Sequence, residues 1–582
     1  MRSDPSPAPG ATSAQEQSSS QQANERSSLL SARSRPSEES HAPSDEEWKP
    51  STRLRFIQAV TWINVFLTGF DSTVAASIYT KVASDFGAAN NAVWVSTSYL
   101  ITAVSFQALY GRLSDILGRR ALFLFGTTVF SIGSLLCGVS NSMLALNISR
   151  AIAGLGGGGL MTMATVVLSD NVPFKRRGLY QAANNLMYGL GGALGASCGG
   201  IVTQLIGWRY VFLLQLPLSL AAVLGGALLV KDPEVMPLPR DAPIDLAGAI
   251  TLVVSVSAFL LALSLGGNEI EWSSWTSISL FALAFSCFYV FFRVAEARAP
   301  APILPARMVF GSRLSKSNVA TNFLSGASIY ATLFTVPLYF LGCRLEDTSR
   351  VGKRLILPAL GFPIGAIAAG YVMSRYGKLG TLVQIGCVVL TLGSLLPLQF
   401  DLDASAPTRS GVYYFLRLIP VQIGQGLINP SSLFTMLAAF PHQDQAVATS
   451  TVYLCRSLGN VAGVAMGSAI LQNWLRAKLP SVIDAALPDA SPIEKQRIVE
   501  SVRHSTDAIR DLPDHYRGAV TETYGRGVMV ALTAAAVLAA LSFISSLWAK
   551  GVGLHRSPDD HKPATARTAP TSGDETLPER LP

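Results

Sequence analysis

The sequence predicts an all-α membrane protein whose chain crosses the bilayer about fourteen times. Its 582 residues are 49% hydrophobic and 14% charged, whereas soluble domains average about 25% charged residues. Apolar runs of about 20 residues follow one another from residue 56 to residue 549, and short basic clusters separate them. These observations exclude a soluble enzyme with a single membrane anchor.

Each apolar run is long enough to span a hydrocarbon core about 30 Å thick as a helix that rises about 1.5 Å per residue. We expect helices at residues 56–79, 93–113, 120–139, 142–168, 180–203, 208–230, 244–266, 275–294, 318–342, 354–373, 379–399, 411–434, 446–474 and 527–549. The 49 glycines suit close packing between such helices.

Two polar tails flank these runs. Residues 1–55 are rich in Ser, Pro, Gln and Glu, and residues 551–582 are similarly polar, so neither tail buries enough apolar surface to fold. Basic residues cluster in the loops on the side of the N-terminus, which predicts that both tails are cytosolic. A loop on the opposite side departs from this pattern, because it carries Arg344, Arg350, Lys353 and Arg354.

The loop after the second run reads Gly111-Arg112-Leu-Ser-Asp115-Ile-Leu-Gly118-Arg119-Arg120. Gly111 and Gly118 allow a tight turn, and Asp115 can pair with an arginine or with the N-terminus of a neighbouring helix. We therefore expect these six named residues to form a conformational latch. A generic basic loop would explain the arginines but not the spacing of the glycines and the aspartate.

A weaker form of this loop follows the tenth run, from Gly370 to Lys378. Two related loops about 260 residues apart predict two homologous six-helix halves. The halves would be residues 56–230 and 296–550, joined by two inserted helices within residues 231–295. The second half would include a polar lumenal loop at residues 475–526 with partly helical periodicity.

The glycine-arginine loop is similar to a signature of the major facilitator superfamily. Residues 94–100, 169–181 and 446–460 further resemble the fungal vacuolar basic amino-acid transporters, which belong to the fourteen-helix drug:proton antiporter branch. The fifth run resembles the antiporter motif of that branch, except that Ala196 stands where proline is usual. The resemblance implies a major facilitator fold in which two halves rock around a central site.

Asp71 is the only acidic residue well inside an apolar run. A carboxylate at membrane depth costs about 3 kcal/mol on insertion scales, so it needs a partner or a hydrated cavity. It could bind and release protons or pair with a cationic substrate. Arg150 in the fourth run is a candidate partner and a second candidate coupling residue, although the pair could instead be purely structural.

Polar residues in the runs that would face a central cavity are candidates for substrate binding. They are Tyr99, Gln107, Asn184, Tyr188, Asn322, Tyr330, Gln422, Gln425 and Tyr453. A hydrogen bond between helices is an equally good explanation for each of them.

The N-terminal tail contains Glu25-Arg-Ser-Ser-Leu29-Leu30. This stretch resembles the acidic dileucine signal that sorting adaptors read to route membrane proteins to vacuoles or lysosomes. A chance match is an equally good explanation for so short a pattern.

Enzymatic chemistry has no support in the sequence. There is no GxxxxGK[ST] loop, no HExxH motif and no clustered His/Cys site, so we expect neither ATP hydrolysis nor a metal or other cofactor. The net charge of +8 comes from the loop clusters, so we expect lipid and not nucleic acid as the partner.

We therefore predict a proton-coupled antiporter of the vacuole membrane that moves Lys, Arg and His out of the cytosol. The first alternative is an exporter of drugs or toxins at the plasma membrane. The second is a receptor with a transporter fold that binds a nutrient and signals without flux.

Overall fold

The computed structural model describes residues 49–86, 94–233, 243–266, 270–295, 299, 301–401, 409–488, 490–504 and 506–549. Over these ranges the chain forms helices and no β-strand. Eleven of the described helices are long and apolar enough to cross a membrane. Three more long helices, α2, α3 and α17, carry more polar residues and pack against them, which agrees with the predicted fourteen crossings.

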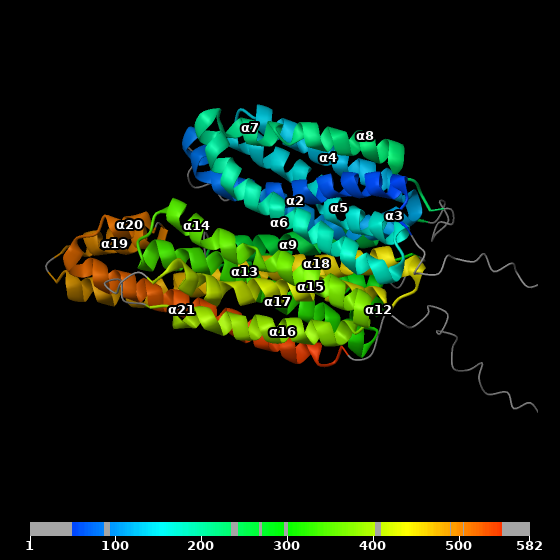
Figure 1. Cartoon of the computed structure of the whole chain (residues 1–582). Helices are drawn as coiled ribbons and strands as arrows, with labels where there is room; N and C mark the ends of the chain where they lie inside the picture. The colour runs from blue at the N-terminus through cyan, green and yellow to red at the C-terminus, as the bar shows by residue number, and fades with distance from the viewer. Residues whose placement is uncertain are drawn as a thin grey trace, which may run out of the picture. The chain divides into compact units, whose positions relative to one another are not determined.

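The helices between residues 52 and 229 pack mainly on one another and are called the first group (Figure 1). They are α2 (Thr52–Asp85), α3 (Trp94–Leu117), α4 (Arg119–Val139), α5 (Met143–Asn171), α6 (Phe174–Leu205), α7 (Trp208–Leu213) and α8 (Leu216–Leu229). The closest pair is α2 and α6, because Gly69, Gly191 and Gly195 let the two backbones approach. A Cβ atom on Gly191 would lie 2.2 Å from the carbonyl oxygen of Phe66.

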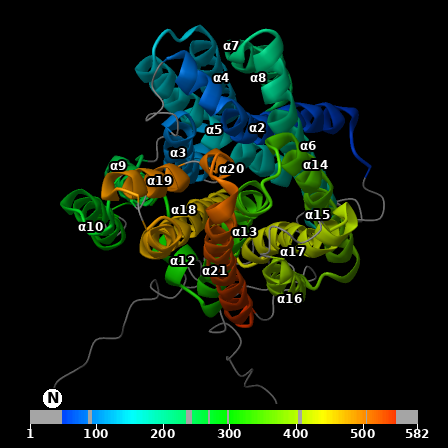
Figure 2. The ribbon, with the colours of Figure 1, turned by 90° about the vertical axis from the view of Figure 1, so that its left-hand side faces the viewer.

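The helices of the second group also pack mainly on one another. It comprises α13 (Arg313–Leu338), α14 (Thr348–Ala359), α15 (Gly361–Tyr376), α16 (Leu379–Leu395), α17 (Gly411–Leu437), α18 (Gln445–Ala486) and α21 (Asp514–Ser546). Between the groups in sequence come α9 (Leu246–Leu265), α10 (Trp275–Val290) and the short α12 (Ala306–Phe310). Figure 2 shows α9 and α10 packed together beside α3 and α18.

Two of the predicted helices are interrupted. The sixth breaks at Leu214 and Gln215, and Pro217 opens the following helix because it lacks a backbone N–H. The tenth breaks at Leu360, two residues after Pro358. The ninth ends in a π-helical turn, Tyr339–Cys343.

Most of segment 475–526 is helical rather than a loop, so the predicted helix end at residue 474 is wrong. Helix α18 continues to Ala486, α19 spans Pro492–His504, α20 spans Asp507–Arg510, and α21 begins at Asp514. The reason is a stripe of apolar residues four apart, Leu475, Leu479 and Ile483, all fully buried. This stripe packs in one cluster with Tyr339 and Phe340 at the end of the second group.

The basic loop that departs from the charge pattern contains a buried ion pair. Arg354 donates from Nε and Nη2 to the two carboxylate oxygens of Glu346, at 2.6 and 2.8 Å. Its guanidinium also lies 4.8 Å from the Tyr414 ring. Arg510 of α20 pairs with Asp347 at 3.2 Å. The carboxylates of this region therefore offset part of its positive charge.

Candidate functional site

A buried ion pair joins α2 and α5. Nη1 of Arg150 lies 2.9 Å from both carboxylate oxygens of Asp71. The exposed fractions are 0% for Asp71 and 1% for Arg150, so neither charge is accessible in this structure. Each charge supplies the partner that the other needs at membrane depth.

Helices α3 and α7 and the break between α7 and α8 complete the surroundings of this pair. Nε of Arg150 donates to the carbonyl oxygen of Val95 at 2.9 Å, in the first turn of α3. The guanidinium lies 4.4 Å from the Tyr99 ring centroid and 5.5 Å from that of Phe212. Nε2 of Gln215 reaches an oxygen of Asp71 at the long distance of 3.5 Å. The break between α7 and α8 places Gln215 here.

Each charge of the pair depends on the other for its counter-charge. A proton on Asp71 would neutralise the carboxylate and leave Arg150 as a buried cation without its counter-charge. Removing one partner of a buried pair typically costs about 3–5 kcal/mol.

Several predicted substrate-binding residues instead connect helices. Gln107 of α3 accepts a hydrogen bond from Ser457 of α18 at 2.9 Å. Asn184 is fully buried and accepts from Gln58 at 3.0 Å. Tyr99 lies against Arg150. For these three side chains the structure gives the contacts of interhelical packing.

The other predicted residues lie on α6, α13, α17 and α18. Tyr453 hydrogen-bonds with Thr165 of α5 at 2.9 Å, and its ring centroid lies 5.5 Å from the guanidinium of Arg456. Asn322 accepts two hydrogen bonds from that guanidinium. The remaining four are half-buried: Tyr188 on α6, Tyr330 on α13, and Gln422 and Gln425 on α17.

Arg456 and Gln215 contact predicted residues but were not themselves predicted, although the sequence carries a signal for both. Arg456 is a basic residue inside the thirteenth apolar run, which is the criterion that singled out Arg150. Gln215 is an amide in an otherwise apolar stretch, two residues before a proline.

The charged residues of the predicted latch belong to an ion-pair network at the end of the bundle that carries residues 111–120, called the loop end here. Arg119 pairs with Asp115 at 2.6 Å and with Asp170 of α5 at 2.9 Å. Nε of Arg112 donates to the carbonyl oxygen of Pro302 at 2.9 Å. The predicted pairing of Asp115 with an arginine is confirmed.

The two glycines of the loop have different tasks. Gly118 has φ +100° and makes the turn between α3 and α4, as predicted. Gly111 does not belong to a turn, so that part of the prediction is wrong. It lies inside α3, where a Cβ atom would sit 2.6 Å from the Ala446 carbonyl oxygen and 2.3 Å from Oγ of Ser450 on α18. Gly111 thus sets the close contact of the two groups.

The second group repeats this arrangement. Gly377 has φ +65° and ends α15, and Gly370 lies inside that helix against α6. A Cβ atom on Gly370 would lie 2.8 Å from the carbonyl oxygen of Gly178. In both groups the packing glycine precedes the turn glycine by seven residues. The two loops are therefore structural counterparts.

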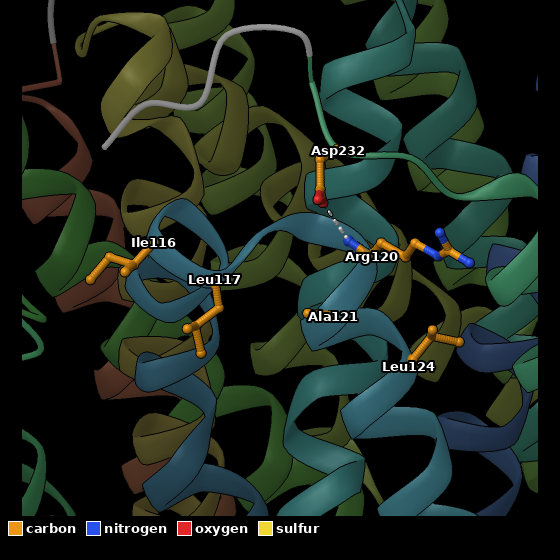
Figure 3. Close-up of a pocket in the computed structure, with 6 residues that line it drawn as sticks. All are labelled: Ile116, Leu117, Arg120, Ala121, Leu124 and Asp232. Carbon is orange, nitrogen blue, oxygen red and sulfur yellow. Dashed lines mark hydrogen bonds between the residues drawn. The ribbon is translucent and has the colours of Figure 1, made fainter. Parts of the chain in front are cut away.

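A pocket of about 520 Å³ lies beside the first loop (Figure 3). It is lined by Ile116, Leu117, Arg120, Ala121, Leu124 and Asp232. The backbone N–H of Arg120 donates to Asp232 at 3.0 Å, while its side chain turns away to the carbonyl oxygen of Ala227. None of the predicted substrate-binding residues lines it, so we do not assign substrate binding to this pocket.

Two predictions concern absences or undescribed residues. The dileucine residues Glu25, Leu29 and Leu30 lie outside the described residues. No group of three or more His, Cys, Asp or Glu side chains within the described ranges could hold a metal ion.

Comparisons with known proteins give evidence on the family of this chain. The model of the Major Facilitator Superfamily matches residues 61–464. The chain is 38% identical over 413 residues to vacuolar basic amino acid transporter 2 of Saccharomyces cerevisiae, covering 67% of this chain and 85% of that protein. It is 31% identical over 506 residues to multidrug resistance protein fnx1 of Schizosaccharomyces pombe, covering 86% and 93%.

The fold also matches a solved structure. The human organic anion transporter MFSD10 aligns over 85% of this chain and 100% of that chain, with a TM-score of 0.57 and 14% identity. That likeness concerns the fold alone. The family consists of membrane transporters of small molecules and not of enzymes. With a family match over more than half of its length, this chain belongs to the major facilitator superfamily.

Proposed function

We propose that this transporter exchanges protons for basic amino acids and moves Lys, Arg and His from the cytosol into the vacuole. The observation that carries the coupling is the fully buried pair of Asp71 and Arg150. The substrate class and the membrane rest on the similarity to vacuolar basic amino acid transporter 2.

In this proposal the pair couples proton binding to the conformational change. The structure has the two groups in contact at the loop end, where Gly111 packs on α18 and Arg177 donates to Gln445 at 2.8 Å. Protonation of Asp71 from the acidic lumen releases Arg150 and favours rearrangement; release of the proton to the cytosol restores the pair. Each pH unit supplies about 1.4 kcal/mol per proton, and each 100 mV supplies about 2.3 kcal/mol per charge.

The test is uptake of labelled lysine, arginine and histidine by liposomes that contain the purified protein, with an imposed pH gradient. The wild type should accumulate these amino acids only when the gradient is present. Asp71→Asn cannot bind and release the proton, so gradient-driven uptake should fall to background. Asp85→Asn makes the same chemical change on the same helix, at a side chain that is 35% exposed, and should retain uptake.

A double variant separates coupling from structure. Asp71→Asn with Arg150→Gln removes both charges and should regain much of the thermal stability lost in the single variants. It should still lack the response to the pH gradient. Recovery of gradient-driven uptake by this variant would show that the pair is only structural.

The alternative function is an exporter of drugs or toxins at the plasma membrane. It is supported by the 31% identity to multidrug resistance protein fnx1. Under this alternative, vacuolar vesicles from cells without the protein would keep their uptake of basic amino acids, and the cells would become sensitive to drugs.

A further inference from the structure

Arg456 lies inside the bundle without an acidic partner among the described residues. It belongs to α18, and its side chain is half-buried between α13 and α17. Its hydrogen bonds go to the amide oxygen of Asn322 at 2.9 and 3.2 Å, the carbonyl oxygen of Asn429 at 3.0 Å and the hydroxyl of Ser432 at 3.2 Å. All of these acceptors are neutral, so the positive charge is solvated by dipoles but not balanced.

The contrast with Arg150 is direct. Arg150 is sealed and has the carboxylate of Asp71 as its counter-charge. Arg456 keeps part of its surface accessible, and its hydrogen bonds to described residues use Nε and Nη2 only. Nη1 remains open to a further acceptor. A guanidinium with one edge that makes no hydrogen bond to described residues is a good receptor for a carboxylate, because the fork geometry fits two oxygens.

The polar groups around Arg456 come from both helix groups. Tyr453 lies beside the guanidinium and bonds to Thr165 of α5. Tyr330 of α13 interacts electrostatically with Arg456. It also interacts with Tyr188 on α6. A ligand held at Arg456 would therefore touch the surfaces that must separate when the groups rock.

We propose that Arg456 binds the α-carboxylate of the amino-acid substrate, and that Asn322 positions the guanidinium for it. This inference rests on the proposed transport of basic amino acids. It adds that the transporter recognises the α-carboxylate of the substrate. It makes the acid group, and not only the cationic side chain, necessary for recognition. Amines without a carboxylate would be poor substrates.

The experiment measures how well unlabelled lysine and lysinamide compete with labelled lysine for uptake into proteoliposomes. Lysinamide lacks the carboxylate charge but keeps the ammonium groups. In the wild type lysine should compete at least about tenfold better, as expected for a hydrogen bond between charged groups. Arg456→Gln should bring this ratio close to one. Arg526→Gln, which removes an exposed arginine paired with Glu522 on α21, is the control and should keep the wild-type ratio.

A second variant decides the matter if Arg456→Gln does not fold. Asn322→Asp keeps the guanidinium and places an acid beside it, so the internal carboxylate should displace that of the substrate and also lower the ratio. If either variant folds and keeps the wild-type ratio of lysine to lysinamide competition, the role of Arg456 is overturned, but the proposed transport function is not. A wild type that takes up no basic amino acid would overturn the proposed function together with it.

Uptake that requires chloride, tested by replacement with methanesulfonate, would assign Arg456 to a free anion and overturn the inference.

Discussion

At the scale of single residues, arginines that are fully or partly buried dominate the chemistry of this protein. Three such arginines are Arg150, Arg354 and Arg456. The groups that stabilise the positive charge differ among them. Arg150 has one carboxylate, Arg354 has a bidentate carboxylate and an aromatic face, and Arg456 has only neutral acceptors among the described residues. Only the last of these leaves a charge for a ligand to balance.

The Glu346–Arg354 pair should be important for stability. Glu346→Gln would leave the guanidinium of Arg354, which is 14% exposed, beside an amide instead of a carboxylate. We expect the loss of about 3–5 kcal/mol that follows removal of one partner of a buried ion pair. The measurement is thermal unfolding of the purified protein in detergent.

The matched control for this prediction is Glu522→Gln, which breaks an exposed ion pair with Arg526. Exposed pairs contribute about 0–1 kcal/mol, so the unfolding temperature should hardly change. Equal effects of the two substitutions would contradict the role assigned to Glu346.

At the scale of helices, the contact between α3 and α18 depends on the missing side chain of Gly111. A methyl group there would lie 2.6 Å from a backbone carbonyl oxygen, which cannot move without moving α18. Gly111→Ala should therefore push the two helices apart and lower the rate of substrate uptake at least several-fold. Uptake in proteoliposomes, normalised to the amount of folded protein, measures this.

Gly200→Ala provides the comparison on α6, because nothing lies within 4 Å of a Cβ atom at that position. This variant should transport like the wild type. If Gly111→Ala did so too, the contact at the loop end would not limit transport.

The sequence was informative about helices wherever apolar runs were long, and less so where two helices touch. It predicted the pair of Asp71 and Arg150, because each is a charge in an apolar run. It could not separate the tasks of Gly111 and Gly118, since the lack of a side chain serves turns and close contacts alike. It also placed the end of α18 too early, because the amphipathic part beyond Trp474 carries charges on its exposed side.

Candidate substrate residues are harder to predict from sequence than buried ion pairs, for a related physical reason. A polar side chain in an apolar run needs a partner, but the run does not say whether that partner is another helix or a ligand. Gln107 bonds to Ser457 across the groups, whereas Asn322 lies against Arg456. Only the three-dimensional arrangement distinguishes these cases.

At the scale of the whole molecule, the N-terminal tail is expected to determine the membrane in which the protein resides. Leu29→Ala with Leu30→Ala should remove the dileucine signal and shift the protein from the vacuole membrane to the cell surface. Fluorescence microscopy of a tagged full-length protein measures this distribution. A variant that still reaches the vacuole would show that the match is a coincidence, and a Ser27→Ala variant controls for changes in the tail.

The seven-residue interval between packing glycine and turn glycine constrains how the chain can change in length. An α-helix turns by about 100° per residue, so one residue inserted between Gly111 and Gly118 would rotate Gly111 away from α18. The same holds for Gly370 and Gly377 relative to α6. These two stretches should therefore tolerate exchanges of their charged side chains far better than any insertion or deletion.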